Sequence, residues 1–143
     1  MYYLIAPLIS WLIAQSLKHV VGLFGYNRRI FKSGSRSLVM LSGGMPSAHS
    51  ATVVSLSVAI GLSEGWTSAI FALSAVFTSV VMYDAVMVRY SSGQQGDLLN
   101  DLIKSNEQQI QPLRIAHGHT MLEASVGAVI GIVVSCVVFF TTQ

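Results

Sequence analysis

Residues 121–140, MLEASVGAVIGIVVSCVVFF, form the stretch that decides the fold. The stretch carries a single charged side chain, Glu123, close to its start. A helix that crosses the hydrocarbon core of a bilayer needs about 20 predominantly apolar residues. The stretch therefore predicts a transmembrane helix. Three further apolar stretches precede it, at residues 3–24, 51–62 and 66–88.

The composition agrees with a membrane protein. Only 10% of the 143 residues are charged and 52% are hydrophobic, whereas a soluble domain has about 25% charged residues. We therefore expect an all-α integral membrane bundle of about four transmembrane helices, with residues 1–143 in a single membrane-embedded domain. The second stretch is short, so it is expected to be tilted, buried among the others, or extended by its polar leader. The net charge of +2 gives little support to a nucleic-acid partner.

Two polar connections set the predicted orientation. Residues 25–42 contain four basic residues and no acid, so the positive-inside rule places this connection in the cytoplasm. Four crossings then put both termini outside, and they put residues 43–50 on the cytoplasmic face of the cell membrane. The second connection, residues 90–113, contains GDLLNDLIKSNEQQI. Its apolar residues have helical spacing, which indicates a short amphipathic helix at the interface.

The octapeptide GGMPSAHS at residues 43–50 precedes the second apolar stretch. Proline suits the first turn of a helix, a serine can cap free amides, and Gly44 permits close approach of a ligand. A helix N-terminus favours an anion such as phosphate. Ser47 and His49 would then face that anion. A capped helix start with an incidental histidine remains the alternative.

A second polar cluster lies in LRIAHGHTMLE, residues 113–123. The spacing of His119 and Glu123 puts both on one face if both lie on the last helix. A carboxylate bonded to one imidazole nitrogen leaves the other nitrogen free to attack. Arg114 is a natural phosphate ligand, and His117 is a weaker candidate. The alternative is a buried polar pair that ties helices together.

Three more charged residues fall inside or beside apolar stretches, where such residues favour a functional site. Asp84 and Arg89 end the third stretch, and their spacing is not ideal for a pair within an α-helix. We therefore expect Asp84 to reach a histidine or lysine and Arg89 to reach a phosphate, with an interfacial charge pair as the alternative. Lys18 either joins the site or snorkels to the interface. A zinc site is a weaker alternative because His119 and Glu123 are the only ligand pair expected on one helix.

Three motifs in order resemble a known family. The segments GGMPSAHSA, YDAVMVR and GHTMLE are similar to the divergent branch of the type-2 phosphatidic acid phosphatase family, which is related to acid phosphatases and vanadium-dependent haloperoxidases. The resemblance runs from Gln15 to Gly131 and so covers nearly the whole chain.

The resemblance implies a metal-independent phosphatase that works through a phosphohistidine intermediate and needs no cofactor. It implies that His119 is the nucleophile, that Glu123 orients it, and that His49 protonates the leaving group. Most members of the wider family have aspartate where this chain has Glu123. The residues expected to hold the phosphate are Lys18, Gly44, Ser47, Arg89 and Arg114, with Asp84 in support. Arg114 is one residue closer to the nucleophile than the family arginine, so Arg89 is an alternative source of the guanidinium.

These observations predict a membrane lipid-phosphate phosphatase. A cytoplasmic site suits an intermediate of phospholipid synthesis, such as phosphatidylglycerol phosphate or phosphatidic acid, held among membrane lipids. The alternatives are a polyprenyl (pyro)phosphate phosphatase, a non-catalytic lipid- or anion-binding or transport module, and a structural membrane subunit. Members of the wider family generally have more than four helices. A homo-oligomer formed through Gly127 and Gly131 is therefore an alternative to packing of these glycines within one chain.

Overall fold

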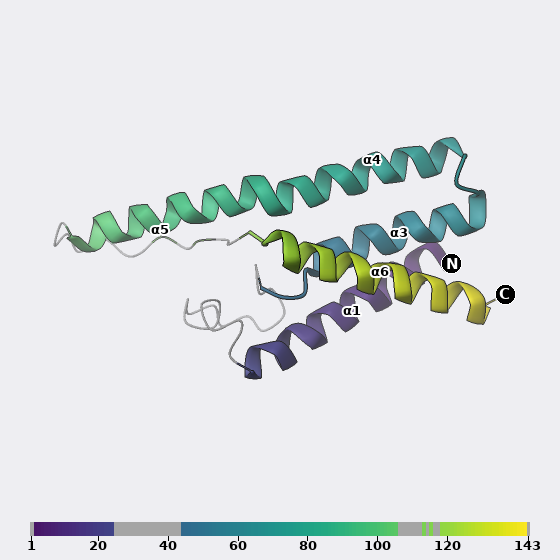
Figure 1. The fold of residues 1–143 in the computed structure, drawn as a ribbon, viewed down its shortest axis with the longest axis horizontal. Coiled ribbons are helices and arrows are strands. Elements are labelled where there is room, and N and C mark those ends of the chain that lie inside the picture. The colour runs from purple at the N-terminus through teal and green to yellow at the C-terminus, as the bar shows by residue number, and fades with distance from the viewer. Residues whose placement is uncertain (1, 25–43, 106–112, 114, 116–117, 143) are drawn as a thin grey trace.

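The computed structural model describes residues 2–24, 44–105, 113, 115 and 118–142 (Figure 1). The described residues form helices and no strand: α1 (Tyr2–Leu23), α3 (Ala48–Glu64), α4 (Ala69–Tyr83), the π-helical segment η1 (Asp84–Val88), α5 (Arg89–Ser105) and α6 (Met121–Thr142). The prediction of an all-α membrane helix bundle is confirmed.

Within the described ranges, three helices are long and apolar enough to cross a membrane: Tyr2–Leu23, Ala69–Ser105 and Met121–Thr142. Helix α3 has 17 residues, so its length of about 25 Å falls short of a hydrocarbon core of about 30 Å. It contacts α1, α4 and α6. The short second stretch is thus both extended by its polar leader, as Ala48 begins the helix, and buried among the other helices.

Helices α4, η1 and α5 form one continuous rod of 37 residues (Figure 1). The sequence predicted that the third helix ends near Val88 and that a separate interfacial helix follows. The amphipathic helix exists, but it extends α4 directly because η1 continues the helical path without a break. At about 1.5 Å per residue the rod is about 55 Å long, so α5 reaches beyond the thickness of a hydrocarbon core.

Small side chains line the inside of the bundle, and large apolar side chains face outward. On α1 the buried residues Ala6, Ser10, Ala14 and Lys18 follow one another at intervals of four, which places them in one row. Leucines of the same helix, such as Leu4, are exposed. Small residues let helix backbones approach closely in a membrane, where lipid solvates the large ones.

Helix α6 packs against α3 through two glycines. A Cβ atom on Gly127 would lie 2.3 Å from the carbonyl oxygen of Ser47, and one on Gly131 would lie 2.5 Å from that of Ala51. Only glycine therefore permits this approach. The two glycines that could have served self-association instead pack within the chain.

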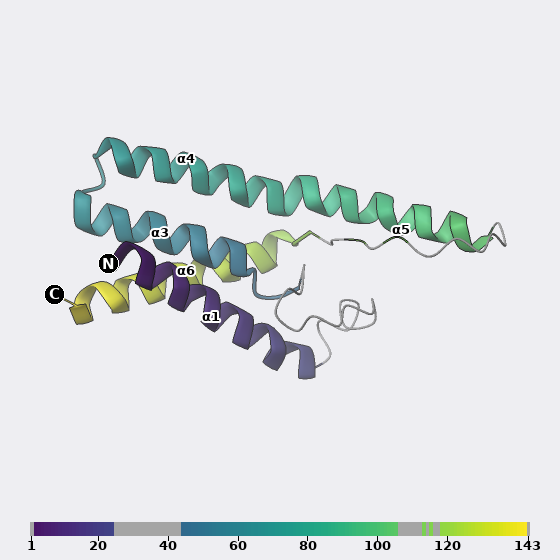
Figure 2. The same ribbon diagram turned by 180° about the vertical axis from the view of Figure 1, so that it is seen from behind.

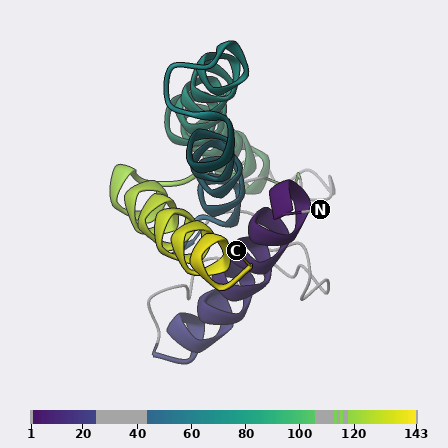
Figure 3. The same ribbon diagram turned by 90° about the vertical axis from the view of Figure 1, so that its right-hand side faces the viewer.

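The bundle has two distinct ends. Both termini and the turn between α3 and α4 lie at one end (Figures 1 and 2). The hydroxyl of Tyr3, in the first turn of α1, donates a hydrogen bond to Glu64, the last residue of α3. The last turns of α1 and the first turns of α3 and α6 lie at the other end. Viewed end-on, α1, α3 and α6 form a triangle and α4 lies on the outer side of α3 (Figure 3). The folding pattern therefore gathers segments from across the sequence at one end.

Candidate active site

The first component of the site is the start of α3. Ser47 caps this helix, since its Oγ accepts hydrogen bonds from the backbone N–H of Ser50 at 3.3 Å and from the Ser50 hydroxyl at 3.1 Å. Pro46 precedes the cap, so it does not occupy the first turn as the sequence suggested. Gly44 is buried and has a φ of 79°, a conformation that glycine adopts readily. His49 lies in the first turn of the helix and is exposed.

The second component is the start of α6, which carries a capping box. The backbone N–H of Thr120 donates to Glu123 Oε2 at 3.0 Å, and the backbone N–H of Glu123 donates to Thr120 Oγ1 at 3.3 Å. Sequence reasoning did not identify Thr120. The Thr-x-x-Glu spacing ahead of an apolar run is the signal that would have revealed it.

His119 lies just before α6 and is held on two sides. Its backbone N–H donates to the carbonyl of Ala85 in η1 at 2.9 Å. Its Nδ1 lies 3.4 Å from Glu123 Oε2, the oxygen that also closes the capping box. The expectation that both residues lie on the helix is wrong for His119, but they still meet because the carboxylate reaches back over the cap.

The His119 ring is almost fully enclosed, with 3% of the residue exposed. Its Nδ1 faces the carboxylate of Glu123, but the two groups do not meet the geometry of a hydrogen bond. Among the described residues, this nitrogen has no other hydrogen-bond partner. Such contacts are often long in a site without ligand and tighten when a substrate binds. The contact leaves Nε2 as the ring nitrogen free of Glu123.

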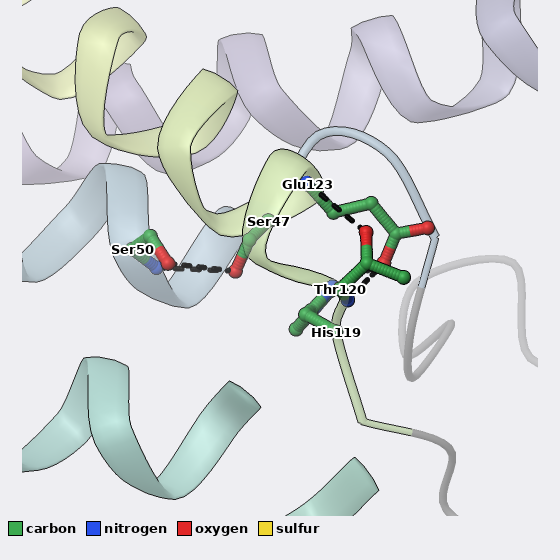
Figure 4. A network of polar contacts seen from close by, with 5 residues as sticks. All are labelled: Ser47, Ser50, His119, Thr120 and Glu123. Carbon is green, nitrogen blue, oxygen red and sulfur yellow. Dashed lines mark hydrogen bonds and ion pairs between the residues drawn. The ribbon is translucent and has the colours of Figure 1, made fainter. Parts of the chain in front are cut away.

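The two components are joined to each other. The backbone N–H of Ser47 donates to the backbone carbonyl of Glu123 at 3.0 Å, and Figure 4 shows Ser47 beside the His119 to Glu123 segment. The ring centroids of His49 and His119 are 6.4 Å apart. Two segments that are 70 residues apart in the sequence thus bring two imidazole rings close together.

Charged side chains surround this pair. Lys18 is the last member of the buried row on α1, with 2% of the residue exposed, and it interacts electrostatically with Glu123. The electrostatic neighbours of the His49 imidazole are Arg89, His119, Lys18 and Asp84. Lys18 is therefore a member of the cluster, since burial excludes the alternative of a lysine that snorkels to the interface.

Asp84 and Arg89 pair with each other, contrary to the expectation that each reaches a different neighbour. Arg89 Nε lies 2.6 Å from Asp84 Oδ2. The two residues are separated by five positions, which an α-helix places poorly but a π-helical turn brings together. The pair spans η1 and is partly exposed, and Arg89 interacts electrostatically with the His49 imidazole while it is paired with Asp84.

A track of contacts along α5 leads to His119. Asn100 donates from Nδ2 to the carbonyl of Leu113 at 3.0 Å and accepts from the Leu113 backbone N–H at 2.7 Å. Ile115 lies against Gly96, where a Cβ atom would come within 2.8 Å of its side chain. Gly118 lies against the backbone of Tyr90, which a Cβ atom would approach to 2.2 Å. Sequence reasoning missed this track because its residues carry no catalytic chemistry.

Two candidates lie outside the described residues: Arg114 and His117. Among the described residues, no three histidine, cysteine or acidic side chains gather in a group that could hold a metal ion. The described cluster consists of two histidines, one buried lysine, one carboxylate that faces a histidine and an Asp–Arg pair, next to a capped helix start.

This fold and site define a helical membrane protein that carries a polar two-histidine cluster at one end of its bundle. The chain belongs to the Divergent PAP2 family, whose model matches residues 1–134. It is 35% identical over 119 residues to the uncharacterized membrane protein YuiD of Bacillus subtilis (strain 168), a match that covers 73% of this chain and 75% of that protein. No solved structure matches the chain.

Proposed function

We propose that this protein is a metal-independent phosphatase of membrane lipid phosphates that works through a phosphohistidine. The observation that carries the proposal is the pair of imidazoles 6.4 Å apart, one exposed and one held by a carboxylate. Catalysis of phosphoryl transfer is mostly a matter of positioning and of charge around the transferred group. Membership in a PAP2-related family supports the same chemistry.

In the first step, Nε2 of His119 attacks phosphorus and the bond to the leaving oxygen breaks. His49, protonated, gives its proton to that oxygen, and the lipid leaves as an alcohol. In the second step, His49 takes a proton from a water molecule whose oxygen attacks phosphorus, the bond between phosphorus and nitrogen breaks, and inorganic phosphate is released. Glu123 stabilises the positive charge that the His119 ring carries during attack.

The phosphate oxygens would be held by donors of three kinds. Lys18 and Arg89 supply charge at the pair of histidines. Arg89 can form forked hydrogen bonds to phosphate, whereas Lys18 acts as a point charge. The start of α3, with Gly44 buried beside it, supplies backbone N–H groups and the positive end of a helix dipole. Arg114 is a further phosphate ligand under this proposal.

The substrate is expected to keep its apolar tail in the bilayer while its phosphate reaches the cluster at the end of the bundle. By the positive-inside rule this end faces the cytoplasm of the cell membrane. Phosphatidylglycerol phosphate and phosphatidic acid are the substrates that this orientation favours. A polyprenyl pyrophosphate is a competing substrate for the same chemistry.

The proposal is tested by the release of inorganic phosphate from a panel of lipid phosphates, with purified full-length protein and a chelator present. Substrate labelled with ³²P should leave label on His119 after a rapid quench that avoids acid, because phosphohistidine is acid-labile. His119→Ala should abolish both turnover and label. Full activity of His119→Ala would overturn the mechanism, and tight binding of phosphate lipids without turnover would identify a non-catalytic binding module.

A further inference from the structure

An apolar groove lies between α1 and α3 on the outside of the bundle. It encloses about 500 Å³, within the range of about 300–1,000 Å³ that is usual for ligand sites. Pro7 and Trp11 contribute to one wall, and Thr52 and Leu56 form the other. The hydroxyl of Thr52 already donates to the carbonyl of Ala48 at 2.8 Å, so the groove offers almost no free polar group to a ligand.

The helix that forms the α3 wall continues toward the site. His49, Thr52 and Leu56 are separated by three and then four positions, so they follow one line on the surface of the helix. Thr52 is one turn from His49. The line of the α3 wall therefore points toward His49, the imidazole that would protonate the leaving group, one turn beyond the residues that line the groove.

The helix that forms the α1 wall continues toward the site as well. Trp11 precedes Lys18 by seven positions, which is about two turns, so both lie on the same side of α1. Helices α1 and α3 run in opposite directions, so the last turns of α1 and the first turns of α3 lie at the same end of the bundle (Figure 2). At the opposite end stands Tyr3, which lines the groove and donates a hydrogen bond to Glu64.

We propose that this groove seats an acyl chain of the lipid whose phosphate occupies the site of Lys18, His49 and His119. The inference rests on the proposed function, because the headgroup position comes from it. The groove is apolar and open to the bilayer, and Lys18 and His49 lie farther along the two helices that form its walls. This arrangement matches an amphiphile with an anionic head. The exposed face of α4, which includes Leu73 and Val76, has no such continuity with the site and is expected to contact bulk lipid.

The first test needs no turnover. Phosphatidic acid with a diazirine in its acyl chain is mixed with the full-length protein in phosphatidylcholine vesicles and irradiated. The same experiment is done with the His119→Ala protein. Label should fall on the peptides that contain Trp11 and Leu56, and excess unlabelled phosphatidic acid should suppress it. Label spread equally over α4, or an equal yield with a phosphatidylcholine probe, would show that the groove holds only bulk lipid and would overturn the inference.

The second test fills the groove. Thr52→Phe and Leu8→Trp should raise the KM for a long-chain lipid phosphate about 10-fold or more, while kcat/KM for a short, water-soluble phosphate ester should stay within about 2-fold. Leu8 is exposed on the α1 wall, so its variant keeps the packed core intact. Val76→Phe on α4 is the matched control and should change neither value.

The two tests separate the inference from the proposed function. If the wild-type chain hydrolyses no phosphate ester but the probe still labels the groove, the phosphatase proposal fails and the acyl site stands. If the groove variants alter long and short substrates equally, or alter neither, the acyl site fails while the phosphatase proposal stands.

Discussion

The starts of α3 and α6 are two capped helix N-termini that lie side by side, and they present their histidines in different ways. His49 lies inside the first turn of α3 and is exposed, whereas His119 precedes α6 and is buried. His119 is fixed by a backbone hydrogen bond to η1 and by the carboxylate of Glu123. The described contacts of His49 are electrostatic and a ring contact.

The difference fits a division of labour. A nucleophile must be held in line with phosphorus. A displacement of the reacting group by about 1 Å can lower the rate about 10²-fold. A group that exchanges protons with solvent must be accessible to water. The enclosed, oriented imidazole therefore suits the covalent step, and the open imidazole suits acid and base catalysis.

The largest effect that tests this division is expected from His49→Ala. General acid catalysis contributes about 10²–10⁴-fold, so kcat for a lipid phosphate, which has an alkoxide leaving group, should fall by about that factor. An aryl phosphate has a leaving group that needs little protonation. The rate of phosphoenzyme formation from an aryl phosphate should therefore fall far less in His49→Ala. Burst-phase kinetics with both substrates measure the difference.

His119→Ala serves as the comparison, because it should abolish phosphoenzyme formation from the alkyl and the aryl substrate alike. Equal losses for the two substrates in His49→Ala would contradict the assignment of the open imidazole as the acid.

A smaller effect is expected from Glu123→Gln. Glutamine can still accept from the backbone N–H of Thr120, so the start of α6 should survive, but the negative charge that faces His119 Nδ1 is lost. Hydrogen-bond partners of a metal-bound histidine are worth about 10- to 100-fold in activity, and we expect a factor of the same order for Glu123. The kcat of the variant should fall by that factor while its thermal unfolding midpoint stays close to that of the wild type.

Thr120→Ala is the control for Glu123→Gln, since it removes the other half of the capping box without touching the imidazole. It should cost about 1 kcal/mol of stability and change kcat little. If the two variants lost activity in proportion to stability, Glu123 would be a structural cap only.

The third effect concerns the contact that holds the two helix starts together. A Cβ atom on Gly127 would meet the carbonyl oxygen of Ser47, which is backbone and moves only with the start of α3. Gly127→Ala should therefore destabilise the fold by about 1–3 kcal/mol, as overpacking generally does. It should also lower kcat, because it shifts His49 relative to His119.

Gly131→Ala is the matched control, because its Cβ atom would meet the carbonyl of Ala51 one turn farther from the site. Both variants should show similar losses in thermal unfolding, but only Gly127→Ala should change kcat strongly at temperatures where both are folded. Equal activities would show that the distance between the two helix starts does not matter for turnover.

Much of this arrangement was predictable from local patterns. Apolar runs located α1, α4 and α6, and the residue types at 43–50 indicated a capped helix start with a histidine. At 113–123 they indicated the pair of His119 and Glu123 but not the cap at Thr120. The geometry of η1 was not predictable, because a π-helical turn has no simple sequence signature, and the Asp84–Arg89 pair depends on it. The burial of Lys18 also depends on which face of α1 meets its neighbours, although its spacing from Ala14 and Ser10 hinted at this.

The smallest effect is expected from Asn100, which lies at the far end of the track along α5 from His119. Its two hydrogen bonds to Leu113 are exposed to solvent, so each contributes about 0.5–1.5 kcal/mol to stability. Asn100→Ala should loosen the segment that leads to His119 and lower kcat by about 5-fold, the equivalent of about 1 kcal/mol, while KM is unchanged. Asn100→Asp keeps an acceptor for the Leu113 N–H and should recover part of the loss.

Gln95→Ala is the control for Asn100→Ala, because Gln95 bonds only to Ser91 of the same helix among the contacts of the described residues. It should leave kcat unchanged. A role for Asn100 in stability alone predicts instead that kcat of the folded protein is normal and only the unfolding midpoint falls. Since the open histidine does not depend on this track, the acid-dependent difference between alkyl and aryl substrates should persist in Asn100→Ala. Loss of that difference would mean that the buried and open imidazoles are not positioned independently.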